Sequence, residues 1–251
     1  MPVSLGGTIA LVALDPGLAK VYAWVAVIGI PLLAVPSIVA LLEHRRRWSS
    51  RSQAWLWVVG LTCSLSLLLF AWTSHAGLAA QAAAVALTAL STCTLAAYLA
   101  VVTPVSWLKV GVLTLTALDI VLVSAQLLQA PNNTLNAATP GADLPHLQVA
   151  LFGSVVMGYG DLFIGAVLGT IIVRDPRLSA VIRPWQGAVL VLCCATAFDA
   201  LFLVVDVLPA TVPVAVALVL LEWRGRRARR QRAGAGRARS DDRVQARRSG
   251  P

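Results

Sequence analysis

The sequence has too few charged residues to form a water-soluble domain. Only 12% of its 251 residues are charged, 58% are hydrophobic, and the mean hydropathy is +0.80. Soluble domains carry about 25% charged residues, so this chain has too little polar surface to cover a hydrophobic core in water. The composition therefore predicts an integral membrane protein.

Cysteine and lysine are also scarce. All four cysteines lie in apolar runs, which argues against a disulfide framework and against a tetrahedral zinc site. We expect neither a metal nor an organic cofactor.

Lys20 and Lys109 are the only lysines. The last apolar segment therefore has no lysine to form a Schiff base, which excludes a retinal-binding seven-helix protein. The cysteines are Cys63, Cys93, Cys193 and Cys194.

The net charge of +9 does not indicate nucleic-acid binding, because the charge is concentrated at one end of the chain. Eleven of the 18 arginines follow Trp223, so the apolar body is nearly neutral. Residues 224–251 are mostly Arg, Ala, Gly, Ser and Asp without apolar periodicity, and we expect them to form a disordered basic tail. Such a tail can anchor the topology, or it can bind anionic lipid head groups.

Seven apolar segments are long enough, or nearly long enough, to cross a bilayer, which requires about 20 residues per helix. They predict an all-α, polytopic membrane bundle of about seven transmembrane helices. Residues 1–20 are apolar in part but too short to cross, and we expect an interfacial N-terminal segment there. The segments are 21–42, 53–72, 77–102, 105–129, 147–173, 185–207 and 208–223.

Basic residues occur in every second connection between these segments. The alternate connections contain no lysine or arginine, so the positive-inside rule places the N-terminus outside and the C-terminus in the cytoplasm. Lys20 is the one basic residue on the other side. We expect a multi-pass protein of a bacterial-type cell membrane. The basic connections hold Arg45, Arg46, Arg47 and Arg51, then Lys109, then Arg174, Arg177 and Arg183, and finally the tail.

Three aspartates lie well inside the predicted spans. A carboxylate at that depth costs at least about 2.5–3.5 kcal/mol, so it indicates function. Asp119 and Asp161 fall at similar depths in consecutive antiparallel spans and can face each other. Two facing carboxylates share one proton, which is the arrangement that aspartic proteases use. Transporters and proton relays use the same residues, and Asp199 is an alternative partner for Asp161.

The residues beside Asp161 favour hydrolysis. Gly158, Tyr159 and Gly160 precede it, and the two glycines remove side-chain bulk where water and an extended peptide could approach. Prepilin peptidases also have a Gly-x-Gly-Asp aspartate, but theirs is followed by x-Lys, whereas here Leu162-Phe163 follows. A second glycine pair, four residues apart at 165 and 169, is typical of tight helix packing.

These motifs make residues 105–223 resemble the presenilin and signal peptide peptidase family of intramembrane aspartyl proteases. Gly158–Asp161 matches the family's Gly-x-Gly-Asp motif in full. Asp119 stands in the place of its Tyr-Asp motif, with Leu118 replacing the tyrosine. Pro209-Ala210-Thr211 matches two of the three residues of its Pro-Ala-Leu motif.

The resemblance implies that Asp119 and Asp161 hydrolyse peptide bonds of transmembrane segments or remnant signal peptides. Gly158, Tyr159 and Gly160, together with Pro209 and Ala210, would then contact the substrate. The predicted orientation is that of signal peptide peptidases and the reverse of presenilins. Residues 21–104 hold three further transmembrane helices without a recognisable motif. A small proton-coupled transporter or channel, or a non-catalytic membrane scaffold, are the alternative functions.

Overall fold

The computed structural model describes residues 16–45, 53–73, 77–125, 127, 133–135, 137–141, 143–153, 155–199, 209, 211–228 and 231. This part of the chain is mostly helical. Its helices include four that are long and apolar enough to cross a membrane. They are α2 (Pro16–Arg45), α3 (Gln53–Thr73), α4 (Leu78–Val102) and α5 (Val105–Ser124).

Large apolar side chains on these helices are exposed, among them Trp55, Val101 and Trp107. An apolar surface of this extent requires a lipid environment, so the chain is an integral membrane protein. The remaining helices are shorter. They are α7 (Tyr159–Arg174), α8 (Pro176–Ser179), α9 (Pro184–Asp199) and a C-terminal helix at residues 212–228.

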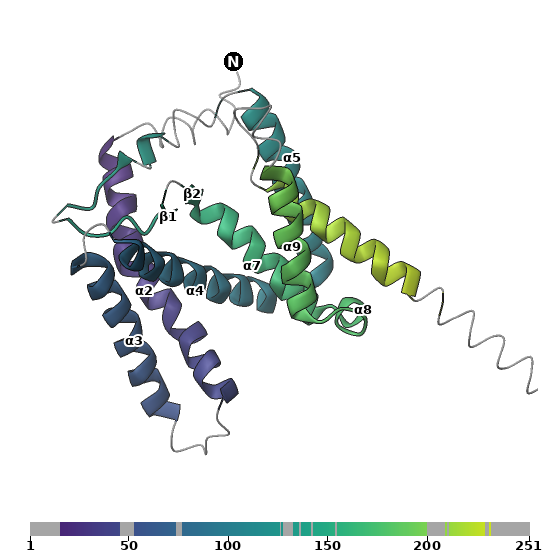
Figure 1. Ribbon diagram of the computed structural model, residues 1–251, viewed down its shortest axis with the longest axis horizontal. Coiled ribbons are helices and arrows are strands. Elements are labelled where there is room, and N and C mark those ends of the chain that lie inside the picture. Colours follow the sequence, from purple (N-terminus) through teal and green to yellow (C-terminus); the bar gives the residue numbers. More distant parts are fainter. Residues whose placement is uncertain are drawn as a thin grey trace, which may run out of the picture.

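The helix α7 lies at the centre of the arrangement (Figure 1). It packs against α4 on one side and against α5 and α9 on the other, while α4 also packs against α2 and α3. A hydrogen bond of 2.7 Å between the hydroxyls of Ser37 and Thr94 ties α2 to α4. The N-terminal helices therefore form one supporting unit, and α7 joins them to the C-terminal half.

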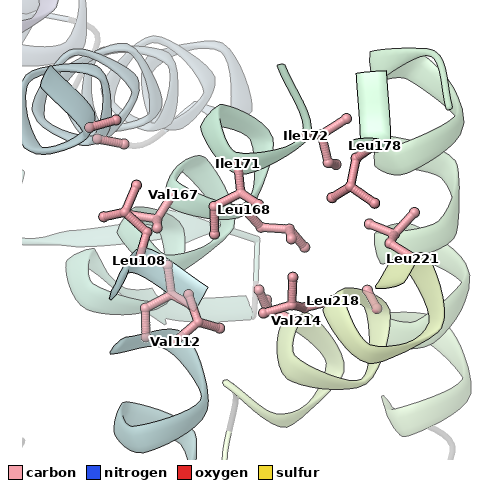
Figure 2. Packing of buried hydrophobic residues seen from close by; sticks show 14 of the residues in the cluster. Leu108, Val112, Val167, Leu168, Ile171, Ile172, Leu178, Val214, Leu218 and Leu221 are labelled. Carbon is pink, nitrogen blue, oxygen red and sulfur yellow. The ribbon is translucent and has the colours of Figure 1, made fainter. Parts of the chain in front are cut away.

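The C-terminal half is held together by one hydrophobic cluster, shown in Figure 2. Leu168 and Ile171 of α7 are fully buried at its centre, between Leu108 of α5 and Leu218 of the C-terminal helix. Aliphatic packing of this kind fixes how helices lie against one another. The cluster therefore sets the relative positions of the polar side chains at both ends of these helices.

The predicted span 147–173 is wrong in its first half. Residues Val149–Phe152 (β1) and Val155–Gly158 (β2) form an antiparallel hairpin, and the helix begins only at Tyr159. Valine in both strands and Phe152 in β1 favour extended backbone. Gly153 adopts φ +62° at the turn, a conformation that glycine tolerates. An apolar run of this length does not distinguish a buried strand from a helix.

Several predicted boundaries also shift. The helix α2 begins at Pro16, so residues 16–20 are not part of a separate interfacial segment; proline is favoured at the first position of a helix. The helix α5 ends at Ser124 rather than at residue 129. The C-terminal helix continues to residue 228, because Arg and Ala favour helix. Residues 224–228, predicted as part of the basic tail, therefore belong to this helix. Residues 1–15 and 232–251 lie outside the described part.

Candidate active site

Asp119 lies on α5, one and a half turns before its end, and is half-buried. Its Oδ2 accepts a hydrogen bond of 2.6 Å from Oγ1 of Thr211. The backbone N–H of Thr211 points to the same oxygen at 3.5 Å. Thr211 immediately precedes the C-terminal helix, so Asp119 is tied to the start of that helix.

Asp161 occupies the first turn of α7, not the middle of a helix as the predicted span implied. Its Oδ2 accepts a hydrogen bond of 3.2 Å from the backbone N–H of Gly158. Acceptors are favoured here, since the first N–H groups of a helix have no partner within the helix. A Cβ at position 158 would lie 3.2 Å from the same Oδ2, so glycine allows this hydrogen-bond geometry without a tight side-chain contact on the carboxylate.

The structure brings Asp119 and Asp161 together from packed neighbouring helices. α5 and α7 are in contact, and the two carboxylates are close enough to interact electrostatically. Two ionised carboxylates that interact in this way repel each other. Carboxyl groups can act as general acid and general base toward a reacting group that reaches both of them.

A cavity of about 510 Å³ opens beside Asp161. Asp161 is the only charged residue among the residues described as lining it, and almost all the others are apolar. The cavity runs between α7, α9 and the first turn of the C-terminal helix, with Leu162, Phe198 and Val214 among its walls. Its walls are apolar and carry one carboxylate, so they favour an apolar ligand over a charged one.

Gly165 and Gly169 of α7 line this cavity instead of packing tightly. A Cβ at Gly165 or Gly169 would meet nothing within 4 Å, so the expectation that this pair packs against a helix is wrong. The close approach occurs elsewhere, at Gly187 of α9, where a Cβ would collide with Cδ1 of Ile172. Gly187 therefore lets α9 lie against α7 and closes the side of the cavity.

The other predicted site residues lie apart from the cavity or outside the described part. Tyr159 donates or accepts a hydrogen bond of 3.1 Å with Ser91 of α4 and packs on the N-terminal helices. Gly160 is exposed with open space beside it. The carbonyl of Pro209 accepts a 3.3 Å hydrogen bond from the Val212 N–H. Ala210 and the side chain of Asp199 lie outside the described residues.

Sequence reasoning missed an ion-pair cluster at the opposite end of the same helices. Nζ of Lys109 donates hydrogen bonds to both Asp175 and Glu222, linking α5, the residue between α7 and α8, and the C-terminal helix. Arg174 donates to the backbone carbonyl of Ala100 close by. Besides its value as a topology signal, a lone lysine inside a predicted span, as Lys109 is, indicates a carboxylate partner.

The ion pairs favour the ionised form of Asp175. Burial raises the pKa of the Asp175 carboxyl. This effect is outweighed by the Lys109 ammonium, by the hydrogen bond from the Arg177 backbone N–H and by the Arg177 charge, which together hold the pKa below its ordinary value. Among the described residues, no group of three or more His, Cys, Asp or Glu side chains is arranged to hold a metal ion.

Comparison of the chain with family models, with curated proteins and with solved structures finds no match.

Proposed function

We propose that this chain is an intramembrane aspartyl protease that uses Asp119 and Asp161. The observation that carries the proposal is that Asp119 and Asp161, on two packed helices, interact electrostatically, and that Asp161 also lines an apolar cavity. The Gly-x-Gly-Asp motif and the order of motifs along the chain resemble the presenilin and signal peptide peptidase family, and they support the same chemistry.

The cavity suggests how a substrate lies. Its apolar walls match the side chains of a transmembrane segment, and Asp161 at the edge would meet the peptide bond. The hairpin β1–β2 ends at Gly158, three residues before Asp161, and within the described residues each of its strands pairs only with the other. An unwound peptide can add to the edge of such a hairpin as a further strand, which would hold the backbone extended for attack.

The substrate class follows from the orientation. The ion-pair cluster of Lys109, Asp175 and Glu222 lies at the end of the helices that the positive-inside rule assigns to the cytoplasm. The two carboxylates lie toward the opposite end. We propose a bundle of seven spans with a cytoplasmic C-terminus and, by resemblance to signal peptide peptidases, substrates whose N-termini face the cytoplasm, including remnant signal peptides.

The experiment uses the purified full chain in nanodiscs with a fluorogenic transmembrane peptide. Asp119→Asn and Asp161→Asn keep the side-chain shape and remove the charge, and each is expected to reduce cleavage at least about a thousandfold, as loss of one member of a catalytic unit does. Mass spectrometry of the products locates the cut. Full cleavage by both variants would refute the proposal. Carboxylate-dependent proton flux without cleavage would support a transporter instead.

A cavity-filling substitution tests the substrate path separately from the chemistry. In Gly165→Leu the new side chain has room at its Cβ and occupies the cavity beside Asp161. The variant is expected to remain folded, since leucine favours helix over glycine by about 0.8 kcal/mol, and to lose cleavage. Gly29→Leu is the matched control, since Gly29 of α2 also has open space and does not line the cavity. Cleavage by Gly165→Leu at the wild-type rate would remove the cavity from the substrate path.

A further inference from the structure

Thr211 supplies hydrogen-bond donors to one of the two carboxylates. Its side chain is buried, with 5% of the residue exposed. The hydroxyl donates to Oδ2 of Asp119 at 2.6 Å, and the backbone N–H of the same residue points to this oxygen at 3.5 Å. A backbone N–H can only donate, so this pair of donors favours an ionised acceptor.

Further contacts hold Thr211 in this position. Its carbonyl accepts a 3.2 Å hydrogen bond from the Ala215 N–H in the first turn of the C-terminal helix. The same carbonyl lies 3.5 Å from the hydroxyl of Thr116, which belongs to α5 and also bonds to the Val112 carbonyl at 2.9 Å. The start of the C-terminal helix is therefore fixed to α5 beside Asp119, and the positive end of the helix dipole favours a negative charge there.

Asp161 has weaker support for a negative charge. Its one hydrogen bond within the described part comes from the Gly158 N–H at 3.2 Å, longer than the Thr211 hydroxyl contact. The first turn of α7 also favours an anion, but an apolar cavity borders this carboxyl. Among the described residues, Asp119 is the charged group that interacts with it. Asp199, at the end of α9, has its side chain outside the described residues.

We infer that Thr211 is a positioning residue that keeps Asp119 as the ionised member of the pair, so that Asp161 carries the shared proton. This inference rests on the proposed function and assigns the two roles within it. Thr211 stands where the family that the chain resembles has leucine, which has no donor in its side chain. The hydroxyl is thus a feature of this chain and not of the motif.

The assignment gives a balanced reaction. Asp119 takes a proton from water as the water oxygen bonds to the carbonyl carbon, and Asp161 gives its proton to the carbonyl oxygen, forming a neutral gem-diol. Asp119 then returns its proton to the amide nitrogen. The C–N bond breaks, and Asp161 takes back a proton from one hydroxyl. The products are an amine and a carboxylic acid, and both aspartates return to their starting states.

The first test compares Thr211→Val, which keeps the shape and removes the hydroxyl, with Thr211→Ser, which keeps the hydroxyl. Loss of a hydrogen bond to a charged group is expected to lower kcat/KM roughly ten- to hundredfold in Thr211→Val. The acid limb of its pH–rate profile is expected to move about one pH unit or more toward neutral. Thr211→Ser should restore both, and an unmoved acid limb in Thr211→Val would overturn the inference.

The second test does not depend on cleavage. Chains labelled with ¹³C at the aspartate carboxyls are titrated by infrared spectroscopy in an Asp161→Asn background, where Asp119 is the remaining member of the pair. Subtracting the spectrum of Asp119→Asn/Asp161→Asn isolates the Asp119 signal. Adding Thr211→Val is expected to make Asp119 protonate at higher pH. Coinciding titrations would overturn the inference. A shifted titration, combined with the absence of peptide cleavage by the wild-type chain, would retain the proton assignment and refute the protease.

Discussion

Replacing Lys109 by methionine is expected to destabilise the fold by about 3 kcal/mol at neutral pH. Lys109 bonds to both Asp175 and Glu222, and the three side chains are 19%, 7% and 23% exposed. Methionine keeps an unbranched side chain and removes its charge, which leaves the Asp175 and Glu222 carboxylates without the ammonium that both of them bind. Breaking a buried pair costs about 3–5 kcal/mol, and partial exposure places this cluster at the lower end of that range.

The loss is expected to depend on pH in a defined direction. The pKa of Asp175 is lowered in the folded protein, chiefly because the bonds to Lys109 and Arg177 outweigh burial, which raises it. A lowered folded pKa contributes stability that is complete above the unfolded pKa of about 3.9 and is lost as the pH falls through the folded value. The gap between wild type and Lys109→Met should therefore be largest near pH 7 and shrink below about pH 4.

The measurement is reversible unfolding in mixed detergent micelles, followed by tryptophan fluorescence at several pH values. Lys20→Met is the control, because Lys20 is the only other lysine and is exposed on α2. Equal stability of Lys109→Met and wild type at pH 7 would refute the reasoning that the cluster holds the helices together. A gap of the same size at pH 3 would show that lost packing, and not charge, is responsible.

Three further substitutions test other parts of the structure. Asn133→Cys, at an exposed position, is expected to react with an impermeant thiol reagent in intact cells; labelling only after permeabilisation would invert the proposed orientation. Tyr159→Phe removes the hydrogen bond to Ser91 and should lower thermal stability by about 1 kcal/mol, and an unchanged unfolding curve would argue against that bond. Gly158→Ala keeps a permitted backbone but presses on the Asp161 carboxylate, so kcat/KM should fall roughly three- to tenfold at unchanged stability; a wild-type rate would mean that the carboxylate tolerates the contact.

Hydropathy was sufficient to predict the long helices, because a bilayer imposes length and composition together. The predicted segments 53–72 and 77–102 match α3 and α4 to within one residue at either end. The same signal failed for residues 149–158, where an apolar run satisfies a strand as well as a helix. The hairpin moves Asp161 from the middle of a predicted span to the first turn of α7.

The candidate carboxylates could be located from sequence, because aspartate is rare within apolar segments and its depth follows from residue counts. Their hydrogen-bond partners could not. Thr211 is 92 residues from Asp119 along the chain, and no local pattern relates the two. In the same way, Lys109 and Glu222 are 113 residues apart. Contacts at such separations depend on how the helices pack against one another. That packing cannot be derived from the local patterns of a single sequence.

The ion-pair cluster, and the carboxylate pair taken together with Thr211, lie on the same three parts of the chain. On α5, Lys109 and Asp119 are ten residues apart, which is about 15 Å of helix; on the C-terminal helix, the distance from Thr211 to Glu222 is about 16 Å. A shift of either helix by one turn, about 5.4 Å, would break the ion pair at one end and the Asp119–Thr211 bond at the other. The cluster therefore fixes the axial register on which the Asp119–Thr211 bond depends. Lys109→Met should lower cleavage in molecules that remain folded, although no atom of Lys109 lines the cavity.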